Sequence, residues 1–157
     1  MAEYTLDLPG DKKLLLSIDD KLSIDVRRVL AGILKETIND IKKSLCESDD
    51  QEGWFYFHLC DLYPHLDSTT EYHNSLDAIT SLYEVTRKTS LIWFHEDEEG
   101  NKVYDGWAPL IGEISWFDEN WLIQYYVPIT VCKYLKDNSV ALWVLASLEK
   151  KKFPKIL

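Results

Sequence analysis

The sequence predicts an α+β fold in which two amphipathic helices in the N-terminal half are followed by an antiparallel β-meander. Two stretches before residue 90 repeat their apolar residues with the period of a helix. Beyond Ser90, short apolar runs alternate with turn residues at close intervals, which is typical of antiparallel strands.

The N-terminal part begins with a turn signal and a short strand. Residues 6–10 end in Pro-Gly, and the apolar run 14–18 predicts the strand. Ser23 is a suitable N-cap for a long helix over residues 23–46. The inward positions of this helix follow a helical period: Val26, Val29, Leu30, Ile33, Leu34, Ile38, Ile41 and Leu45.

The middle of the chain contains one ambiguous element and a second helix. Residues 54–62 are apolar almost throughout and fit either a buried strand or a short helix. The second helix is expected to begin at Asn74 or Ser75 and to end near Lys88. Its inward side chains are Leu76, Ile79, Leu82 and Tyr83.

The C-terminal part is expected to be a meander. Its predicted strands are 91–95, 103–107, 114–117 and 121–131, with a hairpin turn at 98–101 and a tight connection at 118–120. Pro128 indicates an edge strand or a bulge in the last of them. After a turn at 137–139, the apolar run 140–148 fits either a strand or a helix.

The chain of 157 residues has the length of a single domain. We expect a helical part over about 1–90, a sheet-rich part over about 91–148 and a basic C-terminal tail over 149–157. The sequence leaves the oligomeric state open.

Composition indicates a cytoplasmic protein. Cys46, Cys60 and Cys132 are odd in number and far apart, which fits a reducing compartment better than a disulfide framework. The first residues lack a basic region followed by an apolar one, so no secretory signal is expected. No apolar run reaches the roughly 20 residues that a membrane-spanning helix needs, so no membrane association is expected.

The net charge of −10 argues against direct binding to nucleic acid, because duplex recognition begins with Lys and Arg side chains that neutralise phosphates. Phosphate-binding loops and nucleophile motifs are absent from the sequence as well. We therefore expect no enzyme activity and no cofactor.

All four histidines fall between residues 58 and 95, where imidazole, thiol and carboxylate groups that zinc prefers are mixed. The densest stretch contains His58, Cys60, Asp61, His65, Asp67, Glu71 and His73. Its spacing matches no zinc motif, so the favoured interpretation is that no metal binds and that these side chains belong to a core element and a polar loop. A metal-dependent hydrolase that uses His58, His65, His73, Asp61 and Asp67 is the alternative.

Between Leu91 and Trp121 the chain interleaves seven aromatic residues with eight carboxylates and one basic residue, Lys102. Crowded like charges repel one another unless a partner neutralises them, and aromatic residues are typical interface anchors. The predicted partner-binding residues are Glu98, Glu99, Asp105, Trp107, Trp116, Asp118, Glu119 and Trp121. The opposing interpretation is a solvated meander with its aromatics turned inward.

These features predict a small acidic binding protein that neutralises a basic protein partner, itself a nucleic-acid-processing protein. Toxin immunity proteins and phage anti-defence inhibitors share this composition: they are small, acidic and without catalytic motifs. A domain that acts only through homo-oligomerisation is a further alternative.

Overall fold

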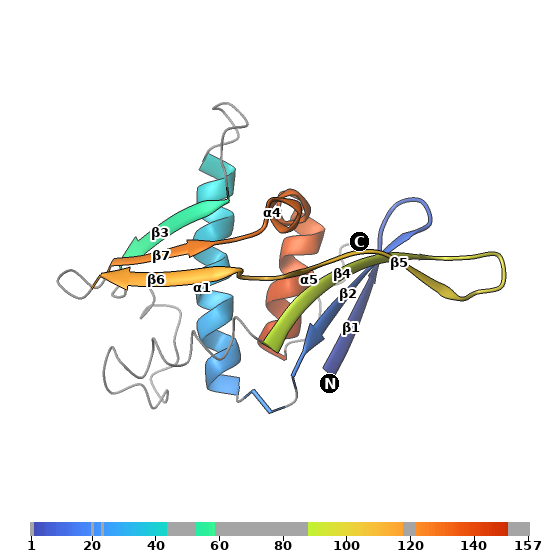
Figure 1. Ribbon diagram of the computed structural model, residues 1–157, viewed down its shortest axis with the longest axis horizontal. Helices are drawn as coiled ribbons and strands as arrows, with labels where there is room; N and C mark the ends of the chain where they lie inside the picture. Colours follow the sequence, from blue (N-terminus) through green and yellow to red (C-terminus); the bar gives the residue numbers. More distant parts are fainter. Residues whose placement is uncertain are drawn as a thin grey trace.

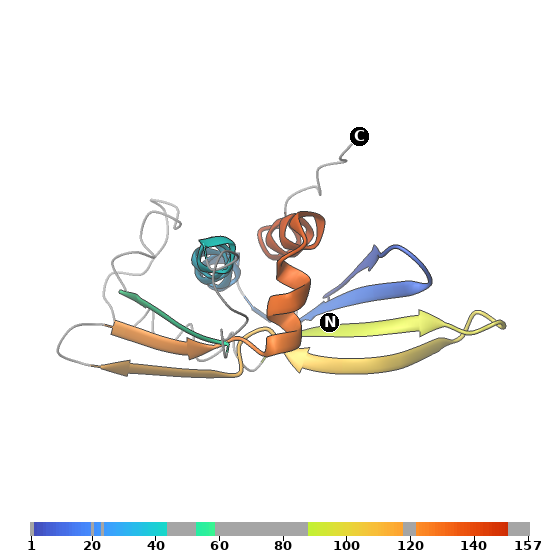
Figure 2. The same ribbon diagram turned by 90° about the horizontal axis from the view of Figure 1, so that it is seen from above.

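The computed structural model describes residues 2–19, 21–22, 24–43, 53–58, 88–117 and 122–150. Within these ranges the chain forms seven strands and three helices (Figure 1). The strands build two antiparallel sheets, and the helices α1 and α5 lie on the same side of both (Figure 2).

The chain begins with a hairpin, not with a helix. Strands β1 (Ala2–Asp7) and β2 (Lys12–Ile18) pair antiparallel along their whole length. The predicted order of two helices followed by a meander is therefore wrong, because this hairpin precedes the first helix. The predicted strand at 14–18 is part of β2, whereas β1 was not predicted. The second predicted helix, from Asn74 or Ser75 to near Lys88, lies outside the described residues except for Lys88 itself.

Helix α1 (Ile24–Lys43) confirms the long amphipathic helix as far as the structure describes it. Its buried face consists of Val29, Leu30, Ile33, Leu34, Ile38 and Ile41. Thr37 on the same helix shares a hydrogen bond of 2.7 Å with the hydroxyl of buried Tyr125. Burial raises the pKa of that hydroxyl, so it stays protonated. The helix is thus held to a neighbouring strand by a polar contact as well as by apolar packing.

The four-stranded sheet, called sheet A, has the order β1-β2-β4-β5. It contains β4 (Thr89–Glu96) and β5 (Lys102–Pro109), which confirm the predicted strands at 91–95 and 103–107 and the turn between them. Strands β1 and β5 are its edges among the described residues.

The three-stranded sheet, called sheet B, has the order β3-β7-β6. Strand β3 (Trp54–His58) shows that residues 54–58 of the ambiguous run form a strand, which pairs with β7 (Leu122–Tyr126); residues 59–62 lie outside the described residues. Strand β6 (Glu113–Phe117) confirms the predicted strand at 114–117.

The predicted continuous meander is interrupted between β5 and β6. The buried residues Leu110 and Ile111 carry the chain from sheet A to sheet B. The amide of Gly112 then donates to the carbonyl of Tyr126 at 2.8 Å, which begins the pairing with β7. The burial of these two apolar side chains fixes the point where the chain changes sheets.

The predicted strand over 121–131 is wrong beyond Tyr126. The carbonyl of Pro128 accepts a hydrogen bond from the amide of Cys132 at 3.0 Å, and helix α4 (Ile129–Leu135) begins there. Proline has no N–H to give to a sheet, and an N-cap position needs none.

Helix α5 (Asn138–Leu148) resolves the last ambiguous run in favour of a helix. The carboxylate of Asp137 caps it by accepting a hydrogen bond from the amide of Ser139 at 2.8 Å.

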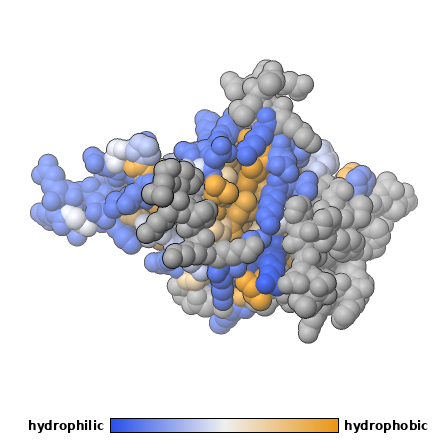
Figure 3. All heavy atoms as spheres, turned by 180° about the vertical axis from the view of Figure 1, so that it is seen from behind, coloured by the Kyte–Doolittle hydropathy of each residue, from blue (hydrophilic) through white to orange (hydrophobic). Residues whose placement is uncertain are grey.

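The side of the molecule on which α1 and α5 lie carries a strip of hydrophobic residues between hydrophilic flanks (Figure 3). A groove of about 530 Å³ lies there, lined in part by Ile38 of α1 and Leu142 of α5. In the described part of the chain, no helix is long and apolar enough to cross a membrane.

Arg27 joins three elements from a buried position on α1. Its Nε donates to the carbonyl of Leu148 at 2.8 Å and its Nη2 to the carbonyl of Ser147 at 2.5 Å. The same Nη2 donates to the hydroxyl of Tyr4 on β1 at 3.0 Å. The guanidinium thus satisfies carbonyls at the end of α5, where the helix dipole is negative.

Candidate functional site

The β4–β5 hairpin projects away from the rest of the described chain (Figure 1). The Asp97 carboxylate closes its tip by accepting hydrogen bonds from the amides of Glu99 at 2.9 Å and Asn101 at 2.8 Å. Gly100 adopts φ 81°, a conformation that costs other residues free energy. The tip therefore has a defined shape, and Glu98 and Glu99 are exposed at its end.

A β-bulge in this hairpin places two aromatic residues on one face. Phe94 pairs with Tyr104 and Trp93 with Gly106, so Asp105 is the extra residue between them. Ile92 pairs with Trp107, and Ile92 and Phe94 lie two residues apart on β4. Tyr104 and Trp107, three residues apart in sequence, therefore share a face of the sheet.

That face points away from the helices. Leu14, Leu16 and Leu91 on the other side of sheet A belong to the hydrophobic core with α1 and α5. Side chains alternate along a strand, so their neighbours project in the opposite direction. We call this the outer face of sheet A; it comprises Asp7, Lys13, Leu15, Ile92, Phe94, Glu96, Lys102, Tyr104 and Trp107.

The outer face of sheet A is an apolar cluster with two exposed rings. Leu15 and Phe94 are buried within it, although no described helix covers them. Tyr104 is 63% exposed and Trp107 64% exposed. The ring of Tyr104 lies 6.3 Å from that of Phe94, between centroids, in a tilted arrangement. Large aromatic rings that stay exposed next to buried apolar side chains are typical of interfaces.

The charges around this cluster are partly paired. Lys13 on β2 lies 3.2 Å from the Asp7 carboxylate and 3.5 Å from that of Glu96. The hydrogen bond that the Lys13 ammonium donates to Asp7, followed by the charges of Asp7 and Glu96, raises the pKa of Lys13 above its ordinary value. Lys102 is the only Lys or Arg in the sequence between Leu91 and Trp121. The sheet adds Lys13 from a distant part of the chain, so internal pairing is greater than expected.

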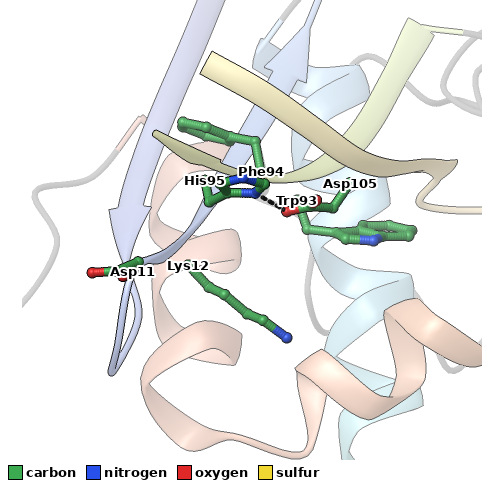
Figure 4. A pocket seen from close by; sticks show the side chains of 6 residues that line it. All are labelled: Asp11, Lys12, Trp93, Phe94, His95 and Asp105. Carbon is green, nitrogen blue, oxygen red and sulfur yellow. Dashed lines mark hydrogen bonds and ion pairs between the residues drawn. The ribbon is translucent and has the colours of Figure 1, made fainter. Parts of the chain in front are cut away.

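Asp105 lies on the opposite side of the hairpin from Trp107. Its carboxylate contacts Nδ1 of His95 at 2.8 Å. These two residues, with Asp11, Lys12, Trp93 and Phe94, line an open depression of about 670 Å³ (Figure 4). The indole of Trp93 covers Gly106 so closely that a Cβ there would overlap it, and its ring centroid lies 5.8 Å from that of Tyr134 on α4. This contact fixes the base of the hairpin.

The structure brings together only part of the predicted binding set. Glu98, Glu99, Asp105 and Trp107 share the hairpin, and Trp116 is on β6 in sheet B. Asp118, Glu119 and Trp121 lie outside the described residues. Tyr104 was absent from the predicted set. In a regular strand, residues three apart such as Tyr104 and Trp107 lie on opposite faces. Only the bulge places the two rings on one face.

Most of the alternative hydrolase site also lies outside the described residues. Of its five side chains only His58 is described, and it is exposed at the end of β3. Within the described ranges no three His, Cys, Asp or Glu side chains form a group that could hold a metal ion. Burial raises the pKa of the Cys132 thiol to about 11, which makes it a poor nucleophile at neutral pH.

No protein-family model matches the chain, and no curated protein matches it. A solved structure that resembles it is the WH1 domain of MSBI1.176, a replication protein isolated from a multiple sclerosis patient. The two chains are 11% identical, with a TM-score of 0.47, over 87% of this chain and 88% of that one. A likeness at this level carries no functional argument.

Proposed function

We propose that this protein binds and neutralises a basic protein partner through the outer face of sheet A and the acidic hairpin tip. The observation that carries this proposal is the pair Tyr104 and Trp107, both largely exposed, on the same hairpin as the exposed carboxylates Glu98 and Glu99. Aromatic anchors supply most of the free energy of binding in many interfaces, and carboxylates around them select a cationic partner.

The binding mode is recognition by side chains, not addition of a strand to β5. A bulge at Asp105 distorts the edge of β5, Lys102 begins the strand, and Pro109 ends it. Natural proteins use these three features to keep an edge strand from pairing with another chain. The projecting rings of Tyr104 and Trp107 are consistent with this mode.

The partner class proposed is a nucleic-acid-processing protein, as for toxin immunity proteins and anti-defence inhibitors. Such a partner carries Lys and Arg side chains where it holds phosphate groups. The carboxylates of Glu98 and Glu99 would occupy that surface and exclude the phosphate substrate. We propose a cytoplasmic location, because an odd number of cysteines spread along the chain fits a reducing compartment.

Photo-crosslinking in the native host tests this function. A photoreactive phenylalanine at Trp107 should trap a basic protein, and the adduct should disappear when Glu98 and Glu99 are both changed to Lys. The same photoreactive residue at Tyr56, which is 55% exposed on sheet B, serves as the matched control and should not trap that protein.

Two outcomes would contradict the proposal. Adducts formed only between copies of this chain would support the homo-oligomer instead. A trapped partner that is acidic, or one whose yield is unchanged by the charge reversal, would remove the reason for assigning the hairpin tip to binding.

A further inference from the structure

We infer that the outer face of sheet A selects arginine over lysine side chains of its partner, with a guanidinium group stacked on Trp107. This inference rests on the proposed function and specifies which type of basic side chain of the partner is bound. It follows from the position of Trp107 on the sheet, from an internal cation–ring contact and from the local charge.

The ring of Trp107 is exposed, and the residues beside it on the neighbouring strands are uncharged. The residues aligned with it across the sheet are Thr5, Leu15 and Ile92, so no ammonium group stands in its own row. Its exposure of 64% leaves most of the side chain accessible. Tryptophan is the best cation–π acceptor among the side chains. Arginine, which is planar and weakly hydrated, stacks on such a ring more readily than the strongly hydrated ammonium of lysine.

The same face already holds a cation over a ring. The Nζ atom of Lys102 lies 5.5 Å from the ring centroid of Phe94. Lys13, the other cation of this face, is engaged with Asp7 and Glu96. Both resident cations therefore have internal contacts on this face.

The local charge favours a cationic occupant. The outer face and the tip together carry the carboxylates of Asp7, Glu96, Asp97, Glu98 and Glu99. Only the ammonium groups of Lys13 and Lys102 oppose them, which leaves a net charge of −3. The tip lies about 20 Å from Trp107 along β5, at a rise of about 3.3 Å per residue. A partner segment with several cations can span that length, with one of them on the indole.

Two short peptides of equal charge test the selectivity: acetyl-(Gly-Arg)₃-amide and acetyl-(Gly-Lys)₃-amide. Binding is followed by NMR through the indole N–H signal of Trp107, which is assigned by its loss in Trp107→Leu. We expect the arginine peptide to bind about fivefold more tightly than the lysine peptide. In Trp107→Leu, followed through backbone amides of β5, the two peptides should bind equally. Trp54→Leu on sheet B is the matched control and should keep the preference.

Equal binding of both peptides to the parent protein would overturn the inference, as would a preference that survives Trp107→Leu. Failure here is separate from failure of the proposed function. A basic partner trapped at Trp107 with no arginine preference would overturn the inference alone. An arginine preference without any basic partner in the host would overturn the proposed function alone.

Discussion

At the residue scale, the side chain with the most connections is Arg27. A buried cation is costly unless its donors are satisfied, and this guanidinium is satisfied by two carbonyls at the end of α5 and by Tyr4. Its contacts span α1, α5 and β1, which are far apart in sequence. No local pattern in the sequence distinguishes Arg27 from an exposed helical arginine, because its acceptors come from the other end of the chain.

We predict that Arg27→Met lowers the free energy of unfolding by roughly 2–4 kcal/mol, because the carbonyls of Ser147 and Leu148 lose a charged donor inside the protein. Urea denaturation followed by circular dichroism measures this loss. Lys42→Met, on an exposed part of the same helix, is the control and should change stability by less than about 0.5 kcal/mol. Equal stabilities of the two variants would show that Arg27 does not join these elements.

Cys132 gives a prediction about pH. Burial raises the pKa of its thiol from 9.0 to about 11, so the reactive thiolate forms only at strongly alkaline pH in the folded protein. In a Cys46→Ser, Cys60→Ser background, alkylation by iodoacetamide should stay slow at pH 9 and accelerate towards pH 11. The unfolded chain should react with a midpoint near 9, so folding is disfavoured progressively as the pH rises above 9. A midpoint near 9 in the folded protein would contradict the burial of this thiol.

At the element scale, elements determined by local interactions were predicted well from the sequence. Elements that depend on contacts between distant residues were not. Helix α1 was predicted from its sequence because its apolar period is local and unbroken. The strand expected at 121–131 was wrong in its second half because alternating apolar residues continue past Pro128, where α4 begins. The change of sheet at Leu110 depends on the core that receives that side chain, which no local pattern encodes.

The hairpin illustrates the same limit for the site. Its acidic tip and turn were predictable from Gly100 and the surrounding carboxylates. The bulge at Asp105 was not, because it arises from the register between β4 and β5. For the same reason the pairing of Lys13 with Glu96 was outside the reach of a sequence argument.

Packing at the base of the hairpin yields a prediction at this scale. Gly106→Ala should destabilise the protein by about 1–3 kcal/mol, because the new methyl group would overlap the indole of Trp93. In a Trp93→Leu background the same substitution should cost much less. Thermal melts of the four proteins give the coupling free energy, and independent effects of the two changes would show that this contact does not hold the hairpin.

At the scale of the whole molecule, two sheets share one helical layer, and no described helix lies on the outer face of either sheet. Sheet A combines an apolar outer cluster with a projecting acidic tip, which separates the two parts of binding in space. The carboxylates at the tip accelerate association over a distance, and the rings on the face slow dissociation after contact. The arrangement therefore predicts that different substitutions affect different rate constants.

The most direct measurement is the kinetics of binding to the partner trapped at Trp107, with variants and ionic strength compared. We predict that Glu98→Lys with Glu99→Lys lowers the association rate constant, and that added salt lowers it in the parent protein. Trp107→Ala should instead raise the dissociation rate constant about 30-fold, equivalent to about 2 kcal/mol, with an unchanged melting temperature. Association and dissociation that are indifferent to salt, to the charge reversal and to Trp107→Ala would contradict the assignment of this surface.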